Sequence, residues 1–480
     1  MEEELAGHQG AAEGFLEWFL QRHVYPEERE RQQMEEECDL VKALVSRIMT
    51  YVHRANVHLF TGEVILVGSQ AQDLHIRAES SSSDYDFLAP IHYSTNLILM
   101  GSLYSKLYTP KGLLPGCRFL EAEVPVYRWG NKVVVDYNKL IMTNILERRN
   151  QDLDLTADDI ETINDRQLQL WKNGVSPYNV MKELCDCVQR ALTEEGGNPA
   201  TRIRNIRLEN SVGLTPISPA VQLSLEVDGR TVSIDLVPTI RNKVDMSMDW
   251  PREDFTWLSN WWDREQGTEQ RKPICNIEDI YKTGTDLVAK NSYWRLTFSL
   301  AETQLLRDID QAGGHRRAAL RVLKKINMEK WVPCYGKVLT SYHLKMVLFW
   351  ASHLKPETKS WATALDALRT LLKVLEFSLK KRHLPSYFLP SVNFFAWHRS
   401  DEELSLKNLV LEALWLEVRL MRCSPEQYLQ LSYDLTVPQS QGPFTQRERE
   451  LEEFRRQHQE DFEGFKNLKI SFDTSLFREL

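Results

Sequence analysis

The sequence predicts an α+β protein of two lobes, a mixed β-sheet lobe followed by a helical lobe. Two observations predict the sheet: an apolar run that ends at Gly68-Ser69 and resumes after a polar loop, and two β-hairpin patterns. The helical lobe is predicted because apolar residues recur at helical spacing beyond Asn291. At 480 residues the chain is long enough for two lobes with separate cores.

The first half carries the sheet elements in order. An acidic start, residues 1–37, contains a helical piece (GFLEWFLQRHV) that Pro26 ends, and residues 38–55 predict a long amphipathic helix. After the strand that ends in the Gly-Ser turn come two hairpins, VPVYRWGNKVVVDY and VQLSLEVDGRTVSIDLV, which turn at Gly-Asn and Asp-Gly. A helical stretch over 153–193 separates the two hairpins.

The second half is predicted to be almost entirely helical. Residues 242–292 are rich in tryptophan and charge and indicate irregular connecting structure. The segments NSYWRLTFSLAETQLLRDI, RRAALRVLKKIN, SYHLKMVLFWASHL, ATALDALRTLLKVLEFSL and LKNLVLEALWLEVRLM each have a helical pattern. A charged helix candidate follows a linker at 438–443. The expected segments are an acidic N-terminal segment (1–37), a core sheet lobe (38–268), a helical C-terminal lobe (269–433), and a linker with a charged tail (434–480).

Composition excludes several classes of protein. The chain is 42% hydrophobic and 26% charged, and its net charge of −9 opposes any global attraction to nucleic acid. No apolar run reaches the length of a bilayer span, and the acidic start lacks the features of a secretion signal. The seven cysteines are scattered, and the one close pair, Cys185 and Cys187, faces different directions on a predicted helix. We expect a cytoplasmic protein without disulfides or zinc.

Residues 66–90 carry the most informative pattern. A strand ends in Gly68-Ser69, and after a serine-rich loop a second strand opens with Asp84-x-Asp86. Alternate residues of a strand face the same side, so the two carboxylates point together. Carboxylate oxygens suit a divalent metal, and a Gly-Ser turn suits phosphate. The alternative is a strand end with two solvated acids; the turn and the apolar flanks favour the metal site.

A third carboxylate is expected from a neighbouring strand. Nucleotidyl transfer uses two divalent metals about 3.5–4 Å apart, and two acids on one strand cannot complete such a site. Asp235 is preferred because it lies inside the apolar run Val232–Val237, where an acid is costly unless a metal or partner neutralises it. Asp136, after three valines, is the rival, although its place at a strand exit also suits a helix N-cap.

The second half offers candidates for base and phosphate contacts. Tyr342 could stack on a base, with Ser341 offering a hydrogen bond, and Arg295 and Thr297 could do similar work. A helical basic face could contact phosphate backbones, although such faces are usually only solvated. This face consists of Arg316, Arg317, Arg321, Lys324, Lys325 and Lys330. Residues 380–382 (Lys-Lys-Arg) form a second basic patch.

With these motifs the chain resembles the Mab-21 family, and within it the cGAS-like receptors. The resemblance covers about residues 40–430. It rests on Gly68-Ser69, Asp84-x-Asp86 and Asp235, and in the second half on WRLTFS, SYHLK and LPSYFLP. Motifs of three kinds in the same order are far more specific than a lone pair of acids.

The resemblance implies a bilobal nucleotidyltransferase fold with the active site between the lobes. It implies an enzyme that joins ATP and a second nucleoside triphosphate, GTP or another, into a cyclic dinucleotide in innate immune sensing. Such enzymes act when a ligand binds, and a STING-type receptor reads their product.

The resemblance also implies a role for each matching residue. The catalytic ligands of Mg²⁺ or Mn²⁺ would be Asp84, Asp86 and Asp235. The nucleotide contacts would be Gly68, Ser69, Arg295, Thr297, Lys324, Ser341 and Tyr342. The activating ligand is expected on Arg316, Arg317, Arg321 and Lys325.

Two departures from the family pattern change the expected ligands. Where the DNA-sensing branch carries a His/Cys zinc insertion, this chain has DQAGGHRR with His315 and no cysteine. No zinc clamp is therefore expected, and double-stranded RNA or another trigger is favoured over DNA. Val237 stands where cGAS has a threonine that helps to recognise guanine, and valine cannot donate that hydrogen bond. Guanine at that subsite, and 2′,3′-cGAMP as product, are therefore in question.

Two other interpretations stay open. A catalytically silent Mab-21 interaction protein would keep the fold without activity, but silent members usually lose the Gly-Ser turn or one acid. A linear oligonucleotide synthetase of the same superfold would need the same three acids and fits the helical-lobe motifs less well. The intact set of acids favours the enzyme.

Overall fold

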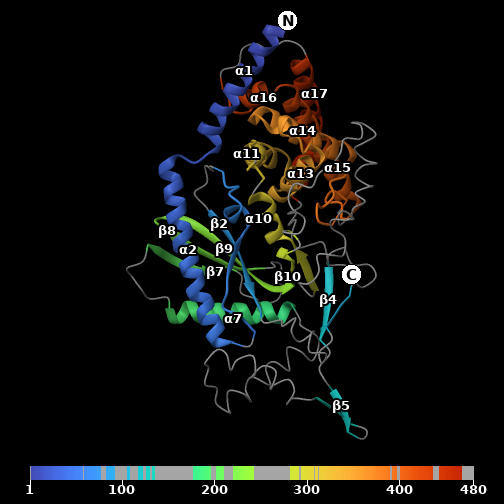
Figure 1. Cartoon of the computed structure of the whole chain (residues 1–480). Coiled ribbons are helices and arrows are strands. Elements are labelled where there is room, and N and C mark those ends of the chain that lie inside the picture. Colours follow the sequence, from blue (N-terminus) through green and yellow to red (C-terminus); the bar gives the residue numbers. More distant parts are fainter. Residues whose placement is uncertain are drawn as a thin grey trace.

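The computed structural model shows a sheet lobe and a helical lobe, which lie one above the other in Figure 1. It describes residues 2–57, 59–76, 83–91, 105–108, 117–122, 126–129, 132–135, 177–195, 202–209, 220–242, 280, 282–290, 293–307, 309–311, 313–389, 392–396, 400–435 and 443–467.

The sheet lobe is organised around its longest strand, β9. Nine of the described strands form one mixed sheet, in which β9 pairs parallel with β2 and antiparallel with β8 and β10. The order is β1-β2-β9-β10-β11-β4-β3. Strand β8 also pairs with β9, β7 pairs with β8, and β5 pairs with β6 separately. The strands are β1 (Ile65–Val67), β2 (Ser83–Pro90), β3 (Ser105–Tyr108), β4 (Cys117–Ala122), β5 (Val126–Trp129), β6 (Lys132–Val135), β7 (Ile203–Leu208), β8 (Val221–Val227), β9 (Arg230–Asn242), β10 (Thr285–Lys290) and β11 (Tyr293–Thr297).

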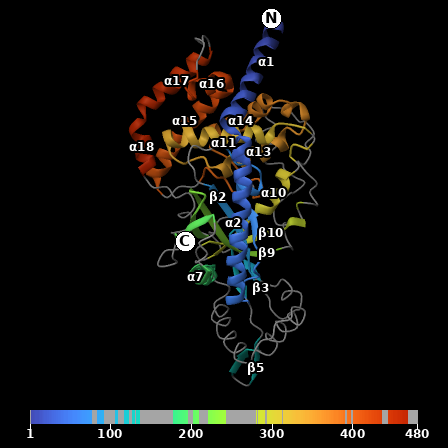
Figure 2. The same cartoon turned by 90° about the vertical axis from the view of Figure 1, so that its left-hand side faces the viewer.

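Two helices bury one face of this sheet. Apolar residues of α2 (Glu28–Ala55) and α7 (Pro177–Glu195) form a core with alternate residues of the central strands, such as Phe87 and Ile234. Figure 2 looks onto the side on which α2 runs along the sheet. Because side chains alternate along a strand, the residues between these buried positions point to the opposite face. That opposite face carries the acidic residues of β2 and β9.

The helical lobe has its own core, in which Trp331, Trp350 and Trp361 are fully buried. Near the sheet, short α3 (Gly68–Ala71) follows β1. The helices of this lobe are α10 (Ser299–Arg307), α11 (Arg316–Ile326), η2 (Asn327–Trp331), α12 (Val332–Tyr335), α13 (Ser341–Leu354), η3 (Thr358–Trp361), α14 (Ala364–Lys381), α15 (Asp401–Cys423), α16 (Pro425–Ser432), α17 (Pro443–Gln457) and α18 (Gln459–Asn467).

The N-terminal segment connects the two lobes. Helix α1 (Glu2–Phe19) and the π-helical turn η1 (Leu20–Val24) add Leu16, Phe19 and Leu20 to the core of the helical lobe. After a break at residues 25–27, α2 joins the sheet lobe instead. No helix in the described part of the chain is long and apolar enough to cross a membrane.

The C-terminal helices α17 and α18 also belong to the helical lobe. Their side chains Phe444, Leu451 and Phe465 are buried in its core. Arg455 forms an ion pair with buried Glu417, which also accepts hydrogen bonds from Tyr335 at 2.5 Å and from Tyr428 at 2.7 Å. This satisfied network fixes the tail helices against α15.

The α+β class and both predicted hairpins are confirmed. The first predicted helix ends before Pro26, and the 153–193 stretch is helical from Pro177, with its earlier part outside the described residues. Two predictions were wrong. Thr285–Lys290 is a strand rather than irregular structure, and the YWRLT part of a predicted helix is strand β11. Both strands are rich in β-branched or aromatic residues, and pairing between neighbours overrides the helical spacing.

Candidate active site

Three predicted acids meet on the adjacent strands β2 and β9, and the group of Asp84, Asp86 and Asp235 is called the acidic edge of the sheet. The parallel register of β2 with β9 places Asp86 directly beside Asp235, and Asp84 lies two residues earlier on the same face of β2. Asp84 is exposed, whereas Asp86 and Asp235 are half-buried. The rival acid, Asp136, lies outside the described residues. Two adjacent strands therefore present their carboxylates on one face.

Gly68 makes room for Asp86. Val67 pairs with Asp86 across β1 and β2, and the chain turns directly afterwards into α3. Gly68 has a φ of +73°, and a Cβ built there would lie 2.1 Å from Oδ2 of Asp86. Any other residue would suffer backbone strain and would collide with this carboxylate. The sequence predicted this glycine as a phosphate turn; the structure adds that it accommodates a predicted metal ligand.

Lys324 of α11 faces this sheet edge from the helical lobe. Its amino group donates a hydrogen bond to the hydroxyl of Ser69 at 3.2 Å and another to the carbonyl of Leu74. The side chain is only 8% exposed. Burial lowers the pKa of Lys324 to about 8, and the nearby charges of Lys345 and Arg321 act in the same direction. The lysine therefore still carries a positive charge at neutral pH.

One cavity of about 960 Å³ separates these two walls. The sheet wall contributes Asp84, Asp86 and Asp235, and the helical wall contributes Lys324 and Ser341. The start of α2 closes a third side, where Glu30, Gln33 and Met34 line the cavity. A volume of this size accommodates a nucleotide-sized ligand. Carboxylates and an amine thus face the same space from opposite walls.

The carboxylates of the sheet wall repel one another. Burial, together with the charges of Asp235 and Asp84, raises the pKa of Asp86 to about 6, and the charge of Lys345 opposes this rise. Although Asp84 reaches solvent, surrounding protein atoms partly desolvate it and raise its pKa, and the charge of Lys337 partly offsets this rise. A cation placed between these acids would relieve the repulsion.

The donor set fits a divalent metal such as Mg²⁺ or Mn²⁺. Three aspartates supply the oxygen ligands that these ions prefer. Among the described residues, however, no group of three or more acidic, His or Cys side chains is close enough to hold an ion. The side chains of Asp84, Asp86 and Asp235 would have to rotate around an ion to complete its coordination.

The other predicted nucleotide contacts are divided. Ser341 lines the cavity, whereas Tyr342, its neighbour at the start of α13, does not; it is 36% exposed, with its ring edge against Phe394. Arg295 and Thr297 lie on β11, two strands from β9, and are not lining residues either. Thr297 instead shares a hydrogen bond of 2.9 Å with Ser299.

The predicted activator face is engaged within the protein. Arg321 lies 2.8 Å from a carboxylate oxygen of Asp73 and packs over the ring of Tyr25, and Arg317 pairs with the same aspartate at 3.5 Å. Arg316 is buried against the ring of Trp361 at 4.4 Å. Lys325, also buried, pairs with Glu329 at 2.5 Å. In this conformation these four side chains do not form an open basic surface.

Two lysines near the acids were missed in the sequence. Lys337 lines the cavity from the bend that follows Gly336, and the sequence around this bend contains no recognisable motif. Lys345 pairs with Glu302 at 2.7 Å and its charge reaches Asp86. Lys345 stands four residues after Ser341 in SYHLK. Helical spacing places these two residues on one face, and this signal could have predicted Lys345.

Comparison with known families agrees with this architecture. The Mab-21 protein nucleotidyltransferase domain matches residues 128–308, and the Mab-21 protein HhH/H2TH-like domain matches residues 315–411. Together the two matches span more than half of the chain. The chain belongs to the Mab-21 family. In this Mab-21 protein the first match includes Asp235, and the second includes Lys324 and Ser341, whereas Gly68, Asp84 and Asp86 precede both.

Curated relatives carry the same family name. The chain is 30% identical to "Protein mab-21-like 3" of Danio rerio over 206 residues, which is 42% of this chain and 50% of that protein. It is 26% identical to "Protein mab-21-like 3" of Xenopus laevis over 187 residues, 38% of this chain and 47% of that protein. The match thus spans about half the length of these relatives.

Proposed function

We propose that this Mab-21 protein is a metal-dependent nucleotidyltransferase that joins ATP and a second nucleoside triphosphate into a cyclic dinucleotide. The observation that supports this proposal is the pairing of Asp86 with Asp235 in register, next to Asp84 and above Gly68. This acidic edge faces Lys324 across one cavity of about 960 Å³. Acids that hold a metal and an amine that holds phosphate are the two requirements of nucleotidyl transfer.

Each wall has a distinct part in the proposed reaction. Lys324 and Ser69 would bind phosphate oxygens of the triphosphate, and Ser341 would contact the nucleotide from the start of α13. The three aspartates would hold Mg²⁺ or Mn²⁺, which would neutralise the phosphates. Asp235 would help to deprotonate the attacking hydroxyl. The hydroxyl oxygen then bonds to the α-phosphorus, the bond to the β-phosphate oxygen breaks, and pyrophosphate leaves; a second transfer closes the ring.

Nucleotide selection and the activating ligand belong to the same proposal. The side chain of Val237 has no hydrogen-bond donor with which to select guanine, so the proposed second nucleotide is GTP or another triphosphate. The proposed activator is double-stranded RNA on Arg316, Arg317, Arg321 and Lys325, and the product would be read by a STING-type receptor in the cytoplasm. Because these cations are engaged by protein groups, RNA contact there would require Arg317 and Arg321 to leave Asp73.

The test is a synthesis assay with the full chain. It is incubated with all four nucleoside triphosphates, Mg²⁺ or Mn²⁺, and double-stranded RNA or DNA, and nuclease-treated products are separated by chromatography. We expect a nuclease-resistant dinucleotide that Asp86→Asn and Asp235→Asn both abolish. Asp228→Asn at the β8–β9 turn is the matched control and should keep full activity. Synthesis that survives in both site variants would contradict the proposal.

A second candidate is a catalytically silent Mab-21 interaction protein. One observation favours it: the described acidic side chains are not gathered into a metal-binding group. Calorimetric titration of Mn²⁺ into the wild type and the Asp86→Asn variant separates the two functions. Binding that depends on Asp86 favours the enzyme, whereas equal heats in both proteins favour the silent module.

A further inference from the structure

A second cavity lies within the helical lobe, away from the acidic edge of the sheet. It has a volume of about 420 Å³, and its lining residues are all different from those of the first cavity. Five of them are cationic: Lys355, Lys359, Arg369, Lys373 and Arg422. They come from the end of α13, from η3, from α14 and from the last turn of α15. We call this cavity the basic pocket.

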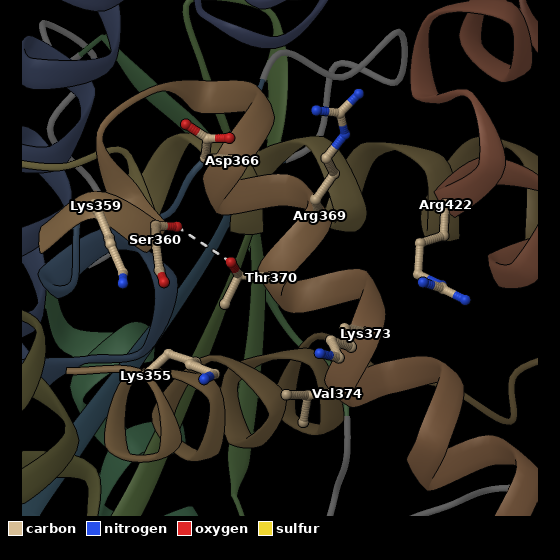
Figure 3. A pocket seen from close by; sticks show the side chains of 9 residues that line it. All are labelled: Lys355, Lys359, Ser360, Asp366, Arg369, Thr370, Lys373, Val374 and Arg422. Carbon is tan, nitrogen blue, oxygen red and sulfur yellow. Dashed lines mark hydrogen bonds between the residues drawn. The ribbon is translucent and has the colours of Figure 1, made fainter. Parts of the chain in front are cut away.

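The five cations surround the hollow from several directions. Figure 3 shows Lys355 and Lys359 on one side of Thr370, and Lys373 and Arg422 on the other. Lys355 and Lys373 are half-buried, whereas Lys359, Arg369 and Arg422 are exposed. Half-buried amines form the inner part of the pocket, and exposed cations form its rim. Grouping like charges in this way is unfavourable unless an anion enters.

Nearby acids offset only part of this charge. The one lining carboxylate, Asp366, already accepts a hydrogen bond from the Thr363 hydroxyl at 3.0 Å. Glu376 pairs with Arg422, and Glu357 lies 3.8 Å from Lys355. Neither Lys359 nor Arg369 makes an ion pair with any other residue that the structure describes. The pocket therefore keeps a local positive charge on a chain whose net charge is −9.

The lining also defines the chemical class of the ligand. No aromatic residue lines the pocket, so a nucleobase would find no stacking surface. Val374 is the sole apolar lining residue, so the directed contacts that the pocket offers come from charged and polar groups. Amines and guanidinium groups bind phosphate oxygens well, and arginine does so through two hydrogen bonds at once. A concave space of this volume holds a small molecule, whereas a duplex needs an extended basic surface.

We propose that the basic pocket binds a small ligand that carries several phosphate groups, at a site separate from the nucleotidyl-transfer cavity. The two sites lie at opposite ends of α13. Ser341, its first residue, lines the transfer cavity, and Lys355, its C-cap, lines the basic pocket. This proposal does not depend on the nucleotidyl-transfer function, because it involves none of that cavity's residues.

Calorimetry with the full chain tests the proposal, with tripolyphosphate and inositol hexakisphosphate as probes at near-physiological salt. The double variant Lys359→Gln/Arg369→Gln removes two exposed charges and should weaken binding about tenfold or more. Lys380→Gln/Lys381→Gln is the matched control; it removes two exposed charges at the end of α14, outside the pocket, and should change affinity less than about twofold. Lys324→Met should leave the affinity for hexakisphosphate unchanged. That result would show that this probe does not bind in the transfer cavity.

Two outcomes would overturn the proposal. One is that the wild type binds neither probe, and the other is that the pocket variant and the control lose affinity equally. Vesicles of phosphatidylcholine with and without a phosphatidylinositol bisphosphate identify the source of the phosphates. If the phosphatidylinositol bisphosphate vesicles capture the wild type but not the pocket variant, the ligand is a lipid headgroup. If the soluble probes bind but the vesicles do not capture the protein, the ligand is a free molecule. If the wild type binds neither probe but binds duplex RNA through Lys359 and Arg369, the first of these outcomes applies and the pocket is assigned to RNA.

Discussion

The two cavities of this protein differ in how their charges are arranged. The cavity between the lobes has carboxylates on the sheet wall and an amine on the helical wall, and a glycine with positive φ lies beneath one acid. The basic pocket lies within one lobe, and most of its charged lining residues are cations. The first contains groups that must be positioned against each other; the second contains groups that need only surround an anion.

This difference predicts different sensitivities to mutation. Catalytic groups lose activity when they move by about 1 Å, because reacting atoms must be aligned. A cluster of long basic side chains tolerates such shifts, because several donors can each rotate to meet a phosphate. Changes at the transfer cavity should therefore have large effects, and single changes at the basic pocket should have small ones.

The largest effect is expected from Gly68→Ala. The new Cβ would lie 2.1 Å from the Asp86 carboxylate, at a backbone φ of +73°. Moving Asp86 away should lower dinucleotide synthesis about 100-fold, and the strain should cost about 1–3 kcal/mol of folding stability. Initial rates and urea unfolding measure the two effects.

Gly229→Ala is the matched control for this substitution. Gly229 also has a positive φ, of +81°, but a Cβ there would meet nothing within 4 Å. It should show the loss of stability without the loss of synthesis. If both alanine variants lose activity equally, strain rather than the Asp86 contact is responsible.

A smaller effect is expected when one lysine is removed from each cavity. Lys324→Met removes the amine that bonds Ser69 and should weaken binding of a non-hydrolysable ATP analogue by about 1.5–3 kcal/mol. Lys359→Met should leave that affinity unchanged and weaken hexakisphosphate binding instead. Calorimetry measures the affinity of each variant for each of the two ligands. Loss of both ligands in either variant would show that the two cavities do not bind independently.

The smallest effect near neutral pH concerns His343, in the first turn of the helix that joins the two cavities. Burial and the nearby charge of Lys407 lower the pKa of His343 from 6.5 to about 3. Between those values the unfolded chain binds a proton that the folded protein does not. The contribution of His343 to stability is therefore complete above the unfolded pKa and falls as the pH drops through this window, by up to about 1.4 kcal/mol per pH unit.

The variant His343→Gln should reduce this acid dependence. Glutamine at this position preserves the capping box with Thr340 while it removes the titrating group. Urea unfolding of both proteins, at a series of pH values from neutral downwards, measures the difference in slope. Parallel curves would mean that His343 titrates in the same way in the folded and unfolded states.

The acidic edge could be predicted from the sequence because its signals are local. The two-residue period of β2 gave Asp84 and Asp86, and the Asp-Gly turn before β9 helped to define the strand that carries Asp235. The ion pairs between residues far apart in the chain could not be predicted from the sequence. The spacing of Arg317 and Arg321 is clear, but their common partner, Asp73, lies in the other half of the chain.

The basic pocket had no local signal at all. Its cations come from four elements between Lys355 and Arg422, and only Arg369 and Lys373 stand at helical spacing on the same helix. Strand β11 was missed for a similar reason: its five residues run directly into α10, so one helical pattern covered both. Long-range packing, rather than residue type, decided these cases.

The break between η1 and α2 has a mechanical consequence. The N-terminal segment is anchored in the helical lobe up to Val24 and in the sheet lobe from Val41 onwards, with Pro26 at the rim of the transfer cavity. Any widening of that cavity must therefore bend or stretch the chain between these two anchors, where residues 25–27 form the non-helical break. These three residues act as a tether that limits how far the walls can part, whatever ligand enters between them.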